Sequence, residues 1–175
     1  MSRANAAAWV AAFAALVVLA NFVIEDSPAP SGKPSSAPEG ARTATVLRAV
    51  DGDTILVRGA NGRTERVRYI GVDTPESVKP DSPVECYGHE ASDFNKQLVQ
   101  GRRVRLVPDA EAQDKYGRSL AFVYLGNTLV QSELLKGGYA RTLEIEPNTS
   151  KAAYFADLER VAIRTRKGLW RTCDR

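Results

Sequence analysis

Residues 44–70 read ATVLRAVDGDTILVRGANGRTERVRYI, and this stretch carries the clearest structural signal in the 175-residue chain. It holds three short runs rich in Val, Ile, Leu and Thr, separated by the turn dipeptides Asp-Gly and Asn-Gly. Asn61-Gly62 between apolar runs is typical of a tight hairpin turn. We therefore expect three successive antiparallel strands, over residues 44–50, 54–58 and 64–70.

The segments that follow show both strand and helix patterns. Strands are expected over residues 104–107 and 119–125. A first helix is expected from Tyr87 to a stop at Gly101, and a second from a cap at Thr128 to Lys136. A third begins at a cap at Ser150, and Trp170 would fill the core beyond it. One side of this last helix carries Tyr154, Leu158, Val161, Ala162 and Thr165. The opening strands have no crossover helices between them, which excludes a doubly wound parallel sheet. The pattern predicts an α+β protein with a mainly β core, a five-stranded OB-fold barrel with three packed α-helices.

Two segments of different composition precede this domain. Residues 1–24 carry one charged side chain, Arg3, and are almost entirely apolar from residue 6 onward. A run of this length without amphipathic period is typical of a secretory signal peptide or of a membrane anchor, and both interpretations stay open. Residues 25–41 are rich in Pro, Ser and Gly, which predicts a disordered linker. Residues 42–175 then form one domain, expected outside the cytoplasm, either secreted or anchored to the membrane by its N-terminal segment.

The net charge excludes no class of partner, but the numbers of cysteines and histidines exclude a zinc site. The 24 Lys and Arg against 21 Asp and Glu give a net charge of +3, which suits a polyanionic partner without requiring one. Two cysteines and one histidine are too few for a zinc site. Outside the cytoplasm we expect Cys86 and Cys173 to form a disulfide, the alternative being two unrelated buried thiols.

Acidic residues follow two of the expected turns. Asp53 begins the second strand and Asp73 follows the third, so adjacent strands can bring both carboxylates to one rim of the barrel. Together with the carbonyl oxygen of Thr74, they would make a hard oxygen site for Ca²⁺ or Mg²⁺. The alternative is that Asp-Gly-Asp only marks a hairpin, because Asp and Gly are common turn residues.

Near these acids lie a candidate base and two candidate phosphate ligands. Glu76 follows a proline that stiffens the backbone, and a carboxylate beside a metal can deprotonate water. Arg68 lies on the third strand, and Arg118 follows a Tyr-Gly turn; a guanidinium can bind two phosphate oxygens and stabilise charge in a phosphoryl transition state. Tyr116 can stack on the substrate. Each residue alone also fits an exposed surface position.

Taken together, the motifs resemble the thermonuclease (staphylococcal nuclease-like) family over about residues 44–171. The resemblance rests on Asp53-Thr54, on Arg68 with Val72-Asp73-Thr74-Pro75-Glu76, and on Asp114-Lys115-Tyr116-Gly117-Arg118, with further matches at Tyr87-Gly88, Glu90-Ala91, Leu120-Ala121 and Gly138. It implies an OB-fold barrel with three helices and calcium-dependent hydrolysis of DNA and RNA, with little sequence preference and 3′-phosphate products.

The resemblance also implies a role for each site residue. Asp53, Asp73 and the Thr74 carbonyl would hold one Ca²⁺ ion, with Mg²⁺ less favoured. Glu76 would act as the general base, and Arg68 and Arg118 would bind the phosphate and its transition state. Lys115 and Tyr116 would bind the substrate, and His89 would have no catalytic part. We expect a monomer that binds nucleic acid, and that contacts a membrane if its N-terminal segment is retained.

The sequence departs from the family at the segment 141–146, where members often carry tyrosines that pack on the nucleotide. Here Glu144 and Glu146 stand in that segment and would repel phosphate. Two other functions stay open: a non-catalytic OB-fold module that binds nucleic acid or protein at the cell surface, and a structural cell-surface domain. Binding alone does not need Glu76, and a structural role leaves the paired acids and arginines unexplained.

Overall fold

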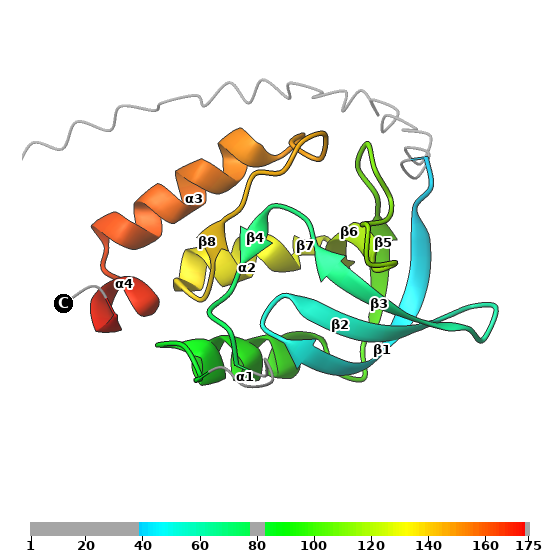
Figure 1. Cartoon of the computed structure of the whole chain (residues 1–175), viewed down its shortest axis with the longest axis horizontal. Helices are drawn as coiled ribbons and strands as arrows, with labels where there is room; N and C mark the ends of the chain where they lie inside the picture. The colour runs from blue at the N-terminus through cyan, green and yellow to red at the C-terminus, as the bar shows by residue number, and fades with distance from the viewer. Residues whose placement is uncertain (1–38, 78–82, 174–175) are drawn as a thin grey trace, which may run out of the picture. The chain divides into compact units, whose positions relative to one another are not determined.

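The structure is a computed structural model that describes residues 39–77 and 83–173 (Figure 1). The expected N-terminal signal or anchor, most of the linker and part of the loop before the first helix lie outside the described residues. Within residues 39–77 and 83–173, no helix is both long enough and apolar enough to span a bilayer.

Eight strands and four helices make up the described part of the chain. They follow in the order β1 (Arg42–Asp51), β2 (Thr54–Gly59), β3 (Thr64–Tyr69), β4 (Val72–Asp73), α1 (Gly88–Val99), β5 (Arg103–Val107), β6 (Ser119–Leu125), β7 (Thr128–Leu129), α2 (Val130–Gly137), β8 (Arg141–Thr142), α3 (Ala152–Arg164) and α4 (Leu169–Thr172).

The predicted barrel is confirmed. Strands β1, β2 and β3 form an antiparallel meander, β5 pairs with the other edge of β1, and β6 pairs with β5. A parallel pairing between β3 and β6 closes the five strands into a barrel. Two register shifts in β1, after Val46 and after Ala49, mark bulges that bend this strand around the barrel. The short strands β4 and β8 pair beside α3 (Figure 1).

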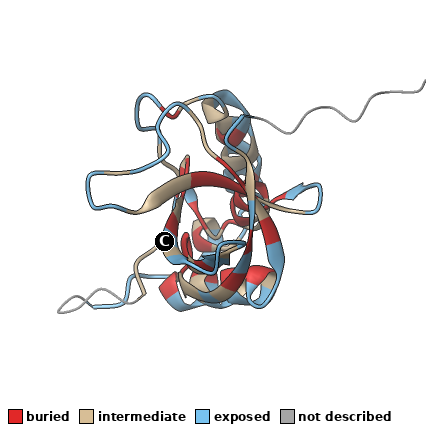
Figure 2. Ribbon diagram, turned by 90° about the vertical axis from the view of Figure 1, so that its right-hand side faces the viewer, coloured by how far each residue is buried: buried red, intermediate tan, exposed pale blue. Residues whose placement is uncertain are grey.

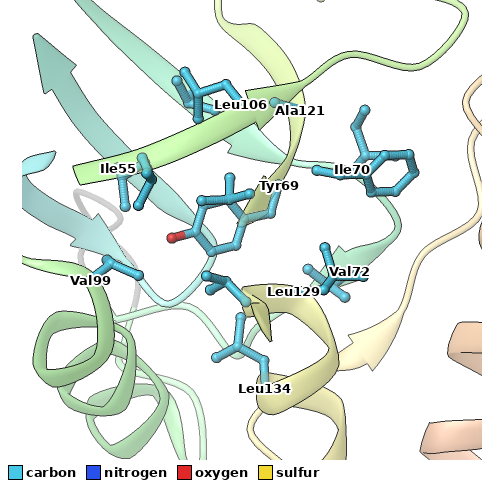
Figure 3. Packing of buried hydrophobic residues seen from close by; sticks show 14 of the residues in the cluster. Ile55, Tyr69, Ile70, Val72, Val99, Leu106, Ala121, Leu129 and Leu134 are labelled. Atoms are coloured by element: carbon cyan, nitrogen blue, oxygen red, sulfur yellow. The ribbon is translucent and has the colours of Figure 1, made fainter. Parts of the chain in front are cut away.

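The barrel interior and the inner sides of the helices form one apolar core. Burial alternates along the strands, as the period of two residues in a strand requires (Figure 2). The ring of Tyr69 lies among apolar side chains from the strands and helices (Figure 3), and its hydroxyl donates to Oδ1 of Asn95 on α1 at 2.9 Å. The second polar atom of this buried amide, Nδ2, donates to the carbonyl of Asp51 at 2.8 Å. The core therefore extends to the turn between β1 and β2.

Three helix details predicted from the sequence are wrong or only partly right. Thr128 does not cap a helix: it lies in β7, because the chain pairs back onto β6 before α2 begins. Ser150 precedes the N-cap residue Lys151, which makes no side-chain cap. The expected stripe on α3 is only partly right: Ala162 is buried and Leu158 packs on the core, but Tyr154 and Val161 are each 47% exposed. Phe155 is buried instead, because α3 packs against α2 and β8 on a face rotated from the expected one.

The residue that fills the core after α3 also differs from the prediction. Leu169 is fully buried, whereas Trp170 is half-buried and the guanidinium of Arg141 lies 4.1 Å from its ring. The backbone of Gly168 packs directly on that of Gly138, and the Leu169 N–H donates to the Gly138 carbonyl at 2.9 Å, which holds Leu169 at this position.

Candidate active site

Arg68 joins the two acidic turns. Its Nη1 atom binds Oδ1 of Asp53, and its Nη2 atom binds Oδ1 of Asp73 at 2.6 Å. Strand pairing explains the geometry: Thr54 lies opposite Arg68 in the β2–β3 register, so the residue before Thr54 lies beside the guanidinium. Asp73, five residues after Arg68, returns to the same guanidinium through the turn that leads into β4. The two carboxylates predicted to share a rim of the barrel therefore converge on one cation.

The Asp53 carboxylate is almost fully buried and is held by Thr74. Its Oδ2 atom accepts hydrogen bonds from the Thr74 backbone N–H at 3.0 Å and from the Thr74 hydroxyl at 3.2 Å. Burial raises the pKa of Asp53, although the charge of Arg68 and the bond from Thr74 lower it. Gly52 allows this approach, because a Cβ atom at that position would lie 2.5 Å from the Thr74 hydroxyl oxygen.

Glu76 lies next to Asp51, a residue to which the sequence assigned no role. The pKa of Asp51 is raised to about 6, chiefly by burial and also by a hydrogen bond with Glu76, while hydrogen bonds from Ser77 and Gly52 act to lower it. The Ser77 hydroxyl donates to Asp51 at 2.7 Å. Asp51 and Glu76 therefore form a carboxyl pair next to the Asp53 carboxylate. The only sequence signal for Asp51 was its place in the Asp-Gly-Asp turn, which is common in ordinary hairpins.

The backbone of Glu76 is held by the segment that leads into α1. Its N–H donates to the Glu85 carboxylate at 3.0 Å, and its carbonyl accepts from the Glu85 N–H at 2.9 Å. Gly88 packs on the same carbonyl, where a Cβ atom would lie 2.5 Å from the oxygen. The next residue after Glu85, Cys86, forms a disulfide with Cys173 at the end of α4. The disulfide therefore links the end of α4 covalently to the segment that holds the backbone of Glu76.

Arg118 faces the site from the turn before β6. Its Nε atom binds Oδ2 of Asp114 at 2.6 Å, and its backbone N–H donates to Oδ1 of the same residue at 2.9 Å. Asp114 also accepts from the Tyr116 N–H at 2.9 Å, so one carboxylate organises the whole turn. Tyr116 is 73% exposed, and the Lys115 ammonium lies 5.1 Å from its ring. Desolvation raises the pKa of Asp114, but these hydrogen bonds and the arginine charge outweigh it and lower the pKa overall.

A single open cleft of about 580 Å³ connects the two arginines. Arg68 and Arg118 line it together with Lys115 and Tyr116, so the structure brings these four predicted residues to one surface. Beyond the arginines the cleft is lined by apolar and acidic residues instead of basic ones. The segment between β8 and α3 contributes Leu143, Ile145 and Glu146, and the connection between β5 and β6 contributes Glu111. Glu146 is exposed there, while Glu144 lies outside this cleft and beside a smaller hollow next to α3.

The donor set fits a hard divalent cation. Asp53 and Asp73 supply carboxylate oxygens, which Ca²⁺ and Mg²⁺ prefer, and both already bind the positive charge of one guanidinium. Within the described residues no three Asp, Glu, His or Cys side chains form a ligand cluster. A metal held here would therefore take its remaining ligands from the backbone, from water and from the substrate, which leaves open coordination positions for chemistry.

Comparisons with known proteins identify the family of this chain. Residues 66–172, more than half of the chain, match the sequence model of the family described as Staphylococcal nuclease homologue. The chain is 41% identical to a thermonuclease of Staphylococcus hyicus over 158 residues, which cover 90% of this chain and 92% of that protein. It is 38% identical to a thermonuclease of Staphylococcus intermedius over 170 residues, or 97% and 99% of the two chains.

A Bacillus endonuclease is also similar to the chain. The chain is 45% identical to the endonuclease YncB of Bacillus subtilis over 128 residues, which cover 72% of this chain and 60% of that protein. The match to the family model and to the two thermonucleases confirms the predicted resemblance. The chain therefore belongs to the staphylococcal nuclease homologue family and is a nuclease that hydrolyses phosphodiester bonds.

Proposed function

We propose that this nuclease is calcium-dependent, cleaves both DNA and RNA with low sequence specificity, and leaves 3′-phosphate ends. One observation carries the proposal: Arg68, which binds both Asp53 and Asp73, lines the same cleft as Arg118. A phosphodiester bound between two arginines would then lie next to a pair of carboxylates that suit a hard cation.

Each residue has a distinct part in this proposal. Asp53, Asp73 and the Thr74 carbonyl hold the calcium ion, which when bound supplies positive charge that stabilises the phosphoryl transition state. Glu76 takes the proton of the attacking water, and its neighbour Asp51 fixes the carboxylate by a hydrogen bond. Arg68 and Arg118 bind the non-bridging oxygens of the phosphate, where charge increases as the attacking oxygen adds to phosphorus.

The exposed aromatic ring beside the arginines supports low sequence specificity. Tyr116 is 73% exposed on the cleft, and the Lys115 ammonium lies beside its ring. Stacking on an aromatic ring tolerates every base, because each base has a π-face. We propose that these two residues bind the substrate in this way, and that Glu146 weakens rather than supports phosphate binding at the far end of the cleft.

We also propose that the enzyme acts outside the cytoplasm as a monomer. The apolar run in residues 1–24 supports export or membrane anchoring, and the Pro, Ser and Gly-rich residues 25–41 suit a linker between that segment and the domain. The Cys86–Cys173 disulfide supports an oxidising compartment, because disulfides persist there and are rare in the cytosol.

A cleavage assay tests the proposed chemistry. Single-stranded DNA and RNA are incubated with the protein in calcium or in chelator, and the products are separated on a gel. We expect degradation of both in calcium and none in chelator. Glu76→Gln is expected to lower kcat by about 10²–10⁴-fold, the usual contribution of a general base. Arg118→Ala is expected to lower it by about 10²–10³-fold, the usual contribution of one group that stabilises the transition state.

Matched variants control for charge and folding. Glu133→Gln and Arg164→Ala remove the same charges from α2 and α3, and neither residue lines the cleft. Both variants are expected to cleave at the wild-type rate. Equal cleavage with calcium and with chelator would contradict the metal dependence. Intact DNA and RNA in calcium, with measurable binding, would instead favour the non-catalytic binding module.

A further inference from the structure

The strands of the barrel carry four exposed arginines that do not line the cleft. Arg48, Arg58, Arg66 and Arg103 lie on β1, β2, β3 and β5, and all four are exposed; we name them the arginine face. Arg58, Arg66 and Arg103 each stand next to a buried valine on the same strand: Val57, Val67 and Val104. Arg48 pairs with Leu56, as Arg66 does, and therefore lies on the same side of the sheet as Arg66. Since successive strand residues point to opposite faces, these four side chains point away from the core.

Strand register places the arginine face in two rows. Arg58 pairs with Thr45, and Thr45 pairs on its other side with Arg103, so the two arginines lie in one row with β1 between them. Arg48 and Arg66 pair with Leu56 from its two sides and form the second row. With about 4.8 Å between neighbouring strands, the Cα atoms within each row are roughly 10 Å apart.

The charge on this face is not neutralised by the protein. Within the described residues, none of the four arginines forms an ion pair with a carboxylate. Of the acids on these strands, Asp51 is buried. Glu65 lines a hollow with Arg66, but its carboxylate is bound by Arg42 at 3.0 Å and by Ser119. The whole chain has nearly equal numbers of basic and acidic residues, but these four arginines form a positive surface.

The arginine face is continuous with the cleft. Arg66 lines a shallow hollow of about 520 Å³ together with Tyr116 and Arg118, and the latter two residues also line the cleft. A strand that leaves the cleft past Tyr116 therefore meets Arg66 first, and then the remaining arginines across β2 and β1. An exposed aromatic ring next to a positive surface is the combination that binds single-stranded nucleic acids, because unpaired bases stack while the cations bind phosphates.

We propose that the arginine face binds the phosphates of a single-stranded polynucleotide beyond the nucleotides held in the cleft, an inference that rests on the function proposed above. Single strands fit better than duplexes, because only an unpaired base can stack on Tyr116 at the border of the two surfaces. The face contributes to the binding of long substrates and has no contact with a dinucleotide in the cleft. The enzyme therefore selects long strands over short products.

A charge-removal variant tests the proposal. The triple variant Arg48→Gln, Arg58→Gln and Arg103→Gln leaves Arg66 in place because it borders the cleft. Cleavage is measured on a single-stranded DNA of about 40 nucleotides, longer than the site of one OB fold, and on a dinucleotide. We expect the ratio of kcat/KM for the long strand to kcat/KM for the dinucleotide to fall at least tenfold.

Binding without cleavage gives an independent readout. The full chain is titrated with a fluorescent strand of about 40 nucleotides in chelator, at several salt concentrations. Each phosphate contact to single-stranded nucleic acid contributes about 0.7 to the slope of log K against log salt, so the triple variant is expected to lower that slope by about 2. If the triple variant does not fold, each single variant is expected to lower the slope by about 0.7.

The control removes equal charge elsewhere. The triple variant Arg164→Gln, Lys167→Gln and Arg171→Gln changes exposed cations around α3 and α4 and is expected to behave as wild type. An equal loss in this control, or an unchanged ratio and slope in the arginine-face variant, would overturn the proposal. Loss of binding to phosphatidylserine vesicles with unchanged DNA binding would also overturn it and make this a membrane surface. Wild-type protein that cleaves neither substrate would refute the proposed function, while binding in chelator would still test the arginine face.

Discussion

Removing the disulfide between Cys86 and Cys173 should cost this domain a large part of its stability. The two cysteines are 87 residues apart in the sequence, so the bond closes a loop that contains all four described helices and two of the five barrel strands, β5 and β6. Without the bond the unfolded chain gains the conformations that the loop had excluded. For a loop of this length the chain-entropy relation gives about 4–5 kcal/mol at 25 °C, an upper value because strain in the folded state subtracts from it.

Urea unfolding of the wild type and of the double variant Cys86→Ser, Cys173→Ser measures this loss. Trp170 lies three residues before Cys173 and reports on the end of the loop by fluorescence, since its indole nitrogen is buried. With an m-value of roughly 2 kcal/mol/M, the midpoint is expected to fall by about 2 M. The m-value itself should rise, because the unfolded variant exposes more surface than the cross-linked unfolded chain.

Reductant provides the control. It should shift the wild type to the midpoint of the double variant and leave the variant unchanged. A loss of stability below about 1 kcal/mol, with equal m-values, would refute the reasoning. It would show that the unfolded chain is restricted by residual structure to a similar extent with and without the bond.

Three further variants test the core and the barrel rim, each by urea or thermal unfolding. Leu134→Ala removes a fully buried side chain and should cost about 2–5 kcal/mol; a loss below 1 kcal/mol would be inconsistent with a close-packed core. Tyr69→Phe should cost about 1–3 kcal/mol, because its hydroxyl donates to a buried amide oxygen at 2.9 Å, and a neutral effect would contradict that bond. For Glu65, burial raises the pKa, but hydrogen bonds from Ser119 and Arg42 outweigh it and hold the pKa below its ordinary 4.5. The ionised carboxylate therefore stabilises the fold fully above pH 4.5 and loses this effect as pH falls through the lower folded pKa. The stability advantage of wild type over Glu65→Gln should vanish in acid. A stability difference that does not depend on pH would exclude this account.

Much of the fold follows from patterns between near neighbours in the sequence. The alternation of apolar residues in 44–70 and the hairpin signal at Asn61-Gly62 are sufficient to predict three paired strands, because side-chain period and turn chemistry are local properties. The sequence also allowed the individual site residues to be predicted, because Asp53, Asp73 and Arg68 lie in motifs whose order and spacing resemble those of a known family. The buried sides of the helices were harder to predict from the sequence. Phe155 rather than Tyr154 is buried, because the orientation of α3 depends on what packs against it.

The convergence of the site depends on contacts between residues far apart in the sequence. The β2–β3 register places Thr54 opposite Arg68, which brings Asp53 to the guanidinium; a shift of one residue would turn Arg68 into the barrel. The parallel pairing of β3 with β6 aligns Arg68 with Leu120, and so brings the Arg118 turn to the same cleft. No local pattern encodes such pairings, because they are selected by the closure of the barrel around a shared apolar core.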